Sequence, residues 1–164
     1  PNEQHLSVVL QKSLEFDGHN IEIINGSVSG STSAGGLNIA EWTLSENNID
    51  LMILCLGAND MLRGINPKET KNNLEEIIEI AKNKNIKVII AGMIAPTSYG
   101  YAYKKSFDKI FSDLSKKHKL QLIPFLLEGV AQKPEFNLSD GMHPNDRGTI
   151  IIGNTLKKAI LKNL

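Results

Sequence analysis

Several features that indicate particular classes of protein are scarce or absent in this sequence of 164 residues. Cys55 is the only cysteine, so no disulfide can form within the chain. It lies among aliphatic residues, and we interpret it as a small buried hydrophobic side chain rather than a nucleophile. No apolar stretch approaches the ~20 residues that a membrane-spanning helix needs, so we expect no stable insertion into a membrane.

Charge and aromatic content argue against a nucleic-acid partner. The 18 lysines and arginines balance the 18 aspartates and glutamates, so the formal net charge is zero and no basic stripe appears. Aromatic residues make up only 5% of the chain, too few for an extended base-stacking surface. The length suits one domain, residues 1–164, with a sizeable core.

What the chain does contain is an alternation of strand and helix patterns. Helical spacing of apolar residues indicates helices within residues 1–16, 37–44, 67–81 and 103–114 and at the C-terminus. Short aliphatic and β-branched runs predict strands at residues 20–28, 49–57, 86–93 and 120–126. Such alternation predicts right-handed βαβ units, a parallel sheet between layers of helices, and therefore a three-layer α/β/α sandwich.

The apolar run from Ile49 to Gly57 organises the rest of the chain. It is typical of a parallel strand covered on both faces, and Asn59 and Asp60 follow directly after it. Ligands of open α/β sheets bind outside the carboxyl ends of the strands, so these two side chains face a candidate site. The alternative is that both merely cap the next turn, as such residues often do.

Polar residues also follow two other predicted strands at the same edge. Gly30 follows the strand at 20–28, and Asp140 and His143 follow the last strand after a loop. Histidine is the usual general base, and a carboxylate on its Nδ1 fixes the tautomer. Pro144 disfavours helical backbone at His143, which holds that residue before the final helix. The alternative is a surface turn that caps this helix.

A backbone N–H at Gly30 and the side-chain amide of Asn59 form a donor pair suited to an oxyanion. Such donors stabilise developing negative charge, and losing one typically costs ~10²–10³ in rate. For Gly30 the alternative is an ordinary helix entry that needs a small residue.

In this order, the motifs resemble those of the SGNH (GDSL-type) hydrolases, in particular the small bacterial thioesterases, lysophospholipases and arylesterases. The second block of that family ends in glycine, matched by Asn25–Gly30; the third is matched by Gly57-Ala58-Asn59-Asp60, and the fifth by Asp140-Gly141-Met142-His143-Pro144. The resemblance extends over essentially the whole chain, and it implies the flavodoxin-like sheet of that family.

The sequence departs from the family at the first block. No Gly-Asp-Ser occurs in residues 1–164, and Val28 stands at the centre of Gly26–Gly30 where a Gly-x-Ser-x-Gly elbow has serine. The family carries its nucleophilic serine after an internal first strand, whose loss would leave buried backbone groups unpaired. We therefore expect a strand and a nucleophile loop before Pro1, and an intact mass matching only these 164 residues would contradict this.

The resemblance implies a serine esterase that acts on acyl or aryl esters or thioesters through an acyl-enzyme, without metal or organic cofactor. Asp140 and His143 would complete the triad, and Gly30 and Asn59 would form the oxyanion hole. Asp60, Met93, Ala95 and Pro96 match positions near the acyl chain. The alternative for the last three is that they close the core, and Tyr99, Tyr101 and Tyr103 either rim the pocket or pack on a helix.

Two other functions remain open at this point. One is a carbohydrate acetyl-esterase of the same family, with a broader and more polar cleft. The other is a non-enzymatic, flavodoxin-like binding module, because Gly30–Gly35 opens a helix and such a turn can cradle a phosphate. This segment lacks the lysine of a P-loop and the pattern Gly-x-Gly-x-x-Gly. The remaining histidines, His5, His19 and His118, are expected on helix or turn surfaces.

Overall fold

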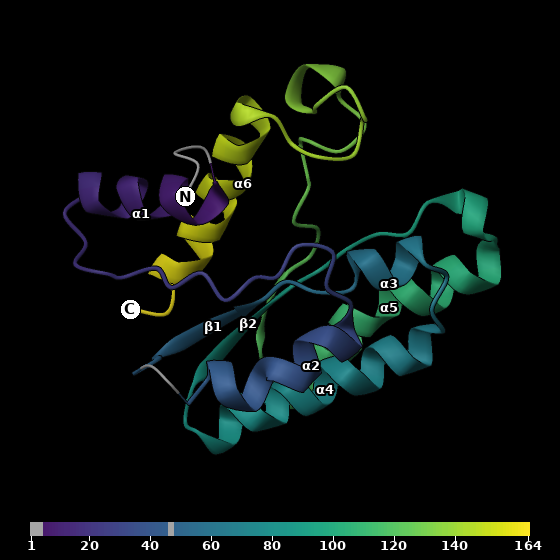
Figure 1. Cartoon of the computed structure of the whole chain (residues 1–164), viewed down its shortest axis with the longest axis horizontal. Coiled ribbons are helices and arrows are strands. Elements are labelled where there is room, and N and C mark those ends of the chain that lie inside the picture. Colours follow the sequence, from purple (N-terminus) through teal and green to yellow (C-terminus); the bar gives the residue numbers. More distant parts are fainter. Residues whose placement is uncertain (1–4, 46–47) are drawn as a thin grey trace. The chain divides into compact units, whose positions relative to one another are not determined.

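The computed structural model describes residues 5–45 and 48–164, so the first four residues of the predicted N-terminal helix lie outside the described part (Figure 1). The chain forms two compact units, each described by itself. One is Gly26–Phe125, and the other combines Pro1–Asn25 with Leu126–Leu164. That residues 1–164 act as one domain stays a prediction.

The Gly26–Phe125 unit contains a parallel sheet of three strands in the order β1-β2-β3. The strands are β1 (Leu51–Leu54), β2 (Lys87–Ala91) and β3 (Gln121–Ile123). Met52 lies opposite Val88, and Ile90 lies opposite Leu122. Four of the five β2 residues are buried, as expected for a central parallel strand with an apolar sequence. The predicted α/β class is therefore confirmed.

Five helical segments connect or flank these strands: α2 (Ser33–Thr43), α3 (Ala58–Leu62), α4 (Pro67–Asn83), the 3₁₀ turn η1 (Thr97–Tyr99) and α5 (Tyr101–His118). The predicted start of α4 is confirmed. The side chain of Asn66 accepts a hydrogen bond of 3.0 Å from the Lys68 N–H, and Pro67 occupies the first turn. A cap and a proline at these positions satisfy or remove backbone donors that a helix start leaves unpaired.

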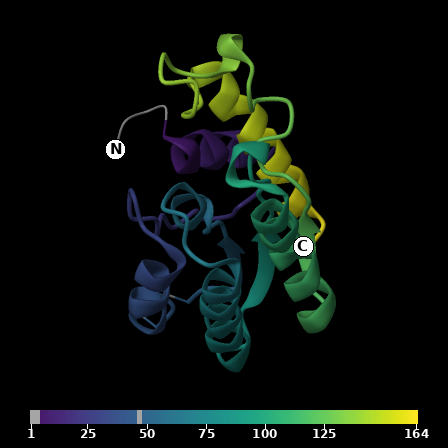
Figure 2. The ribbon, with the colours of Figure 1, turned by 90° about the vertical axis from the view of Figure 1, so that its right-hand side faces the viewer.

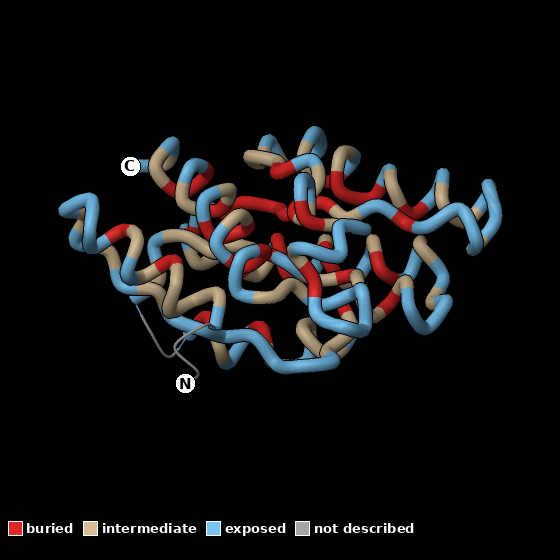
Figure 3. The backbone as a smooth tube through the Cα atoms, turned by 90° about the horizontal axis from the view of Figure 1, so that it is seen from above, coloured by how far each residue is buried: buried red, intermediate tan, exposed pale blue. Residues whose placement is uncertain are grey.

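The core of this unit lies where α4 and α5 pack against the sheet, and its buried residues are red in Figure 3. Phe107 stacks on Tyr103 with ring centroids 6.0 Å apart and meets Phe111 edge-on at 5.7 Å. These rings and the buried aliphatic side chains of α4 form one continuous core. The fully buried members with the largest side chains are Leu74, Ile78, Ile90, Phe107, Ile110 and Leu114.

The other unit is built on α1 (Leu6–Phe16) and α6 (Asp146–Leu161), with the 3₁₀ turn η2 (Pro134–Phe136) between the sheet-forming unit and α6 in sequence. The purple α1 and the yellow α6 lie against each other in Figures 1 and 2. Lys157 on α6 joins them, because its ammonium donates to the Ser13 carbonyl and hydroxyl at 2.9 Å each and pairs with Asp17 at 2.5 Å.

The strand predicted at residues 20–28 is wrong, because this segment has no strand assignment in the structure. Its backbone is bound by a side chain instead of a neighbouring strand. The Gln11 amide donates to the Ile21 carbonyl at 2.8 Å and accepts from the Ile23 N–H at 2.6 Å. A β-branched sequence favours extended backbone, but a strand also needs a backbone partner.

The other predicted strands are present but shorter than their apolar runs. Pairing of β3 stops before Pro124, which has no N–H to donate. Cys55, just after β1, is exposed rather than buried. Within the part of the chain that the structure describes, no helix combines the length and apolar character needed to cross a bilayer.

Candidate active site

The loop before α6 brings Asp140 and His143 into direct contact. Nδ1 of His143 lies 2.7 Å from Oδ2 of Asp140. The other carboxylate oxygen, Oδ1, accepts hydrogen bonds from the backbone N–H groups of Met142 at 2.8 Å and His143 at 2.9 Å. Gly141 has a φ of 68°, a conformation that glycine adopts without strain. The spacing Asp-x-x-His thus closes a single tight turn.

These contacts determine the charge of the aspartate and the tautomer of the histidine. Hydrogen bonds from the backbone N–H and ring of His143, and then from the Met142 N–H, lower the pKa of Asp140 from 3.8 to about 2. An ionised carboxylate only accepts hydrogen bonds, so the neutral ring is assigned a hydrogen on Nδ1. Its Nε2 then carries a lone pair, which suits a general base.

Two asparagines and a glycine hold this loop at the start of α6. The Asn145 side chain accepts from the N–H groups of Arg147 and Gly148, which caps the helix. The buried Asn137 donates to the carbonyls of Val130 at 2.7 Å and Lys133 at 2.8 Å. A Cβ at Gly148 would collide with the carbonyl oxygen of Phe136. Asp140 and His143 are therefore exposed, but the loop that carries them is tightly packed against the start of α6.

In the Gly26–Phe125 unit, the loop that contains Gly30 is bound to the segment that contains Asn59. Nδ2 of Asn59 donates to the Ser31 carbonyl at 3.0 Å, and the Arg63 guanidinium donates to the Gly30 carbonyl at 3.0 Å. Gly30 has a φ of 74°. An amide nitrogen carries two hydrogens, so Asn59 keeps a second N–H beyond the one that Ser31 accepts.

The sequence motifs thus form two local groups. The structure brings Asp140 together with His143, and the Gly30 loop together with Asn59. The first group belongs to the unit that includes Leu126–Leu164 and the second to the unit Gly26–Phe125, and each group is described only within its own unit.

Asp60 was predicted to lie near substrate, but the structure buries it completely at 0% exposure. Its Oδ2 accepts from the Ser33 N–H at 2.7 Å, and its Oδ1 accepts from the Thr70 hydroxyl at 3.1 Å. The Ser33 hydroxyl also bonds Oδ1. The protein's own donors thus bond both carboxylate oxygens, and contact of Asp60 with substrate stays a prediction.

The loop after β2, which contains the other predicted substrate residues, is held by a pair of charged side chains from α5. The Ala95 N–H donates to Asp108 at 2.8 Å, and the Ala95 carbonyl accepts from Lys104 at 2.8 Å. Lys104 and Asp108 also pair with each other at 2.7 Å. Ala95 itself is buried, Met93 is half-buried and Pro96 is exposed. Among these three, Met93 and Pro96 retain surface that a ligand can reach.

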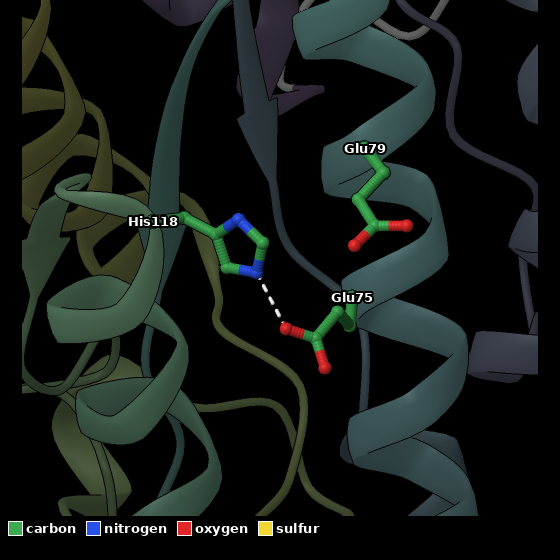
Figure 4. A group of neighbouring side chains, drawn as sticks. All are labelled: Glu75, Glu79 and His118. Carbon is green, nitrogen blue, oxygen red and sulfur yellow. Dashed lines mark hydrogen bonds and ion pairs between the residues drawn. The ribbon is translucent and has the colours of Figure 1, made fainter.

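A group of side chains on α4 and α5 has the composition of a metal site (Figure 4). Ligand atoms of Glu75, Glu79 and His118 lie within 4.8 Å of one another. Glu75, however, already accepts from His118 Nε2 at 2.5 Å and from the Lys117 ammonium at 2.8 Å. These bonds, that of Lys117 first, lower the pKa of Glu75. The group acts as an ion-pair connection between two helices.

Sequence reasoning missed two of these features. His118 was expected on a helix surface, yet its side chain is only 9% exposed. The contacts of Lys104 and Asp108 with Ala95 were not predicted either. Their i, i+4 spacing on a helix was the available signal, but it indicates only an ordinary surface ion pair.

Comparison with known proteins places this geometry in context. The chain is 34% identical over 164 residues to an arylesterase of Vibrio mimicus, and the match covers 100% of this chain and 82% of that protein. It is 36% identical over 136 residues to the esterase TesA of Pseudomonas aeruginosa, over 83% of this chain and 68% of that protein. It is 32% identical over 138 residues to thioesterase 1/protease 1/lysophospholipase L1 of Escherichia coli, over 84% and 66%.

Solved structures show the same fold. A crystal structure of TesA superposes with a TM-score of 0.94 at 31% identity, covering 100% of this chain and 91% of that one. The psychrotrophic esterase EstA from Pseudoalteromonas sp., inhibited by monoethylphosphonate, superposes with a TM-score of 0.92 at 28% identity, covering 98% and 87%. The predicted SGNH hydrolase fold is therefore confirmed.

A family model adds the last piece of this comparison. The model of the GDSL-like Lipase/Acylhydrolase family matches residues 2–149, a range that includes every motif residue identified in the sequence. Together with the match to an arylesterase over all 164 residues of this chain, this confirms the resemblance inferred from the motifs. The chain belongs to the GDSL-like lipase/acylhydrolase family.

Proposed function

We propose that this protein is a serine esterase that hydrolyses carboxylic ester or thioester bonds of acyl or aryl substrates through an acyl-enzyme. The observation that carries the proposal is the 2.7 Å contact between Nδ1 of His143 and the carboxylate of Asp140. The relatives named arylesterase, esterase and thioesterase support the same reaction class.

The nucleophile in this proposal is the serine of the Gly-Asp-Ser-Leu block that the family resemblance implies. That block is not among residues 1–164. Activity is therefore measured on the natural protein. The residues of this chain supply the other groups of the reaction.

In the first half of the reaction, His143 acts as a general base. Its Nε2 takes the proton from the serine hydroxyl as the serine oxygen bonds to the substrate carbonyl carbon. Asp140 accepts from Nδ1–H and stabilises the imidazolium without taking its proton. The tetrahedral intermediate then collapses, and the imidazolium gives its proton to the departing alcohol or thiol. The acyl group remains bonded to the serine oxygen.

In the second half, His143 removes a proton from water as the water oxygen attacks the acyl carbonyl. The new tetrahedral intermediate breaks the bond to the serine oxygen, and the imidazolium returns a proton to that oxygen. A carboxylic acid is released and the serine is regenerated. One imidazole thus serves as base and then acid in each half, which needs no metal or redox group.

We assign to Gly30 and Asn59 the stabilisation of the negative charge that develops on the carbonyl oxygen. The backbone N–H of Gly30 and the second N–H of Asn59 are the proposed donors. Ser31 O holds the first N–H of Asn59 at 3.0 Å, which fixes the direction of the amide before substrate arrives. Donors fixed in advance stabilise the transition state without a cost of reorganisation.

The substrate class follows from the loop after β2. Ile94 is 46% exposed, and the neighbouring Met93 and Pro96 also present apolar surface. We assign this surface, rather than the carboxylate of Asp60, to the acyl or aryl part of the ester. Burial of apolar surface in such a contact is favourable by about 25 cal/mol per Å².

Hydrolysis of p-nitrophenyl esters of increasing acyl length, compared with hydrolysis of acetylated sugars, tests the proposal. We expect a higher kcat/KM for the p-nitrophenyl esters and a dependence on acyl length. Preference for acetylated sugars would favour a carbohydrate acetyl-esterase. Absence of activity on both, together with binding of a nucleotide in calorimetry, would favour a flavodoxin-like binding module.

A further inference from the structure

One buried charged group has no part in the proton transfers described above. Among the residues that the structure describes, Asp60 is the one charged side chain in the buried class, with 0% of its surface exposed. Burying a carboxylate is costly unless hydrogen bonds replace its lost hydration. We therefore ask which groups the buried carboxylate of Asp60 orients through its hydrogen bonds.

Three donors converge on the carboxylate, and their directions are determined by the surrounding bonds. The Ser33 N–H donates to Oδ2 at 2.7 Å, and the Thr70 hydroxyl donates to Oδ1 at 3.1 Å. The Ser33 hydroxyl accepts from Nδ2 of Asn73 at 3.0 Å, so its own hydrogen is directed to Oδ1 of Asp60. This acceptor therefore connects the first residue of α2, α3 and the first turn of α4.

Helix α3 and its C-cap residue Arg63 bind the chain between Gly30 and Ser33 at three points. Asn59 donates to the carbonyl of Ser31, and Arg63 donates to the carbonyl of Gly30, both at 3.0 Å. Asp60, between them in sequence, holds Ser33. The Arg63 contact is exposed and the Asn59 contact is only partly buried, so water competes for both. The Asp60 contacts are the buried ones.

We propose that Asp60 is a positioning residue of the oxyanion hole: its buried carboxylate fixes the loop of Gly30 against the segment of Asn59 and so sets the separation of the two donors. The inference rests on the proposed function, because it assigns a second role within the same site. It contradicts direct contact of Asp60 with substrate, since both oxygens are already bonded.

The expected consequence is a loss of kcat with little change in KM. The donors act on the oxyanion of the transition state rather than on the ground-state ester, so their misplacement lowers kcat. A displacement of about 1 Å can cost about 10²-fold in rate. Asp60→Asn replaces one acceptor by an amide N–H that faces the converging donors, and we expect kcat to fall about 10- to 100-fold.

If Asp60→Asn does not fold, two less disruptive variants at Thr70 test the same positioning role. Thr70→Val removes one donor to Oδ1 and keeps the shape of the side chain, whereas Thr70→Ser keeps the donor. We expect Thr70→Val to lower kcat and Thr70→Ser to restore most of it. Ile78→Val is the matched control on α4, since it removes a buried methyl group without touching the network.

The readouts are kcat and KM on a p-nitrophenyl ester with the full-length protein, and Tm for each variant. The inference is overturned if kcat is unchanged in Asp60→Asn or Thr70→Val, or if it falls no more than in Ile78→Val. It is also overturned if KM rises while kcat stays constant, because that pattern indicates direct substrate contact. Equal kcat values for Thr70→Val and Thr70→Ser would count against it as well.

A measurement without substrate separates this inference from the proposed function. We expect the side-chain amide resonance of Asn59 to shift in Asp60→Asn and Thr70→Val. The backbone N–H of Ser31, which donates to Val28 O at 3.1 Å, should exchange faster with solvent. If the wild type lacks esterase activity but these changes occur, the proposed function fails and the loop connection stands. If activity is present and the loop signals do not change, the inference fails alone.

Discussion

The carboxylate of Asp140 binds His143 twice, through the ring and through the backbone. Oδ2 lies 2.7 Å from Nδ1, and Oδ1 lies 2.9 Å from the backbone nitrogen of the same residue. The ring therefore cannot turn far without breaking the bond to Oδ2, while the backbone bond keeps the carboxylate in place. This double contact fixes the direction of an exposed imidazole ring, as the proposed general base requires.

The first prediction concerns the titration of Asp140. Its pKa is lowered to about 2, so its hydrogen bonds favour the folded state at pH values above the unfolded value of 3.8, and this contribution is lost as the pH falls through about 2. We expect the side-chain carboxyl ¹³C resonance of Asp140 to titrate with a midpoint near pH 2. In His143→Ala this midpoint should move to higher pH. A midpoint near 3.8 in the wild type would show that the turn is not formed.

The second prediction compares two glycines of α6. A Cβ at Gly148 collides with the carbonyl oxygen of Phe136, whereas one at Gly153 makes ordinary contact with Val9 at 3.5 Å. We expect Gly148→Ala to lower the free energy of unfolding by about 1–3 kcal/mol through overpacking. Gly153→Ala should raise it by about 0.5–1 kcal/mol, because alanine favours helix. Urea unfolding of both variants measures the difference, and equal stabilities would contradict the packing at Gly148.

The third prediction concerns the side-chain amide of Asn59, the proposed oxyanion donor. Asn59→Ala removes one N–H, and we expect kcat on a p-nitrophenyl ester to fall about 10²–10³-fold with KM nearly unchanged. The control is Asn72→Ala, because Asn72 is exposed on α4. Similar kcat values for the two variants would exclude Asn59 from stabilisation of the transition state.

The fourth prediction concerns the loop after β2. Lys104 and Asp108 hold both backbone groups of Ala95 at 2.8 Å, so Lys104→Met frees its carbonyl. We expect the preference among p-nitrophenyl esters of different acyl length to weaken, with a larger change in KM than in kcat. Lys71→Met, which breaks the exposed pair with Asp113, is the control. An unaltered acyl-length profile in Lys104→Met would remove this loop from substrate binding.

The sequence predicted most of the fold because local signals agreed with tertiary structure. Asn66 and Pro67 marked the start of α4, and the aliphatic runs marked three strands that do pair. The strand prediction for residues 20–28 was wrong, because β-branched residues indicate extended backbone but do not indicate which group will bond to that backbone. In the structure a glutamine side chain, Gln11, bonds to Ile21 and Ile23 of this segment.

A contact between two candidate site residues was predictable where they are close in sequence. Asp140 and His143 meet within one turn, so their spacing alone indicated contact. The role proposed for Asp60 depends on Ser33 and Thr70, which reach it only through the packing of α2 and α4. A polar residue after a strand suggests a ligand site, and only burial distinguishes it from a structural acceptor.

The central claim is that His143 is the base of an ester hydrolase, and His143→Ala in the full-length protein tests it most directly. The control is His19→Ala, whose histidine lies just after α1. On a p-nitrophenyl ester, we predict that kcat falls about 10⁴-fold or more in His143→Ala and is unchanged in His19→Ala. A His143→Ala enzyme with wild-type kcat would contradict the account.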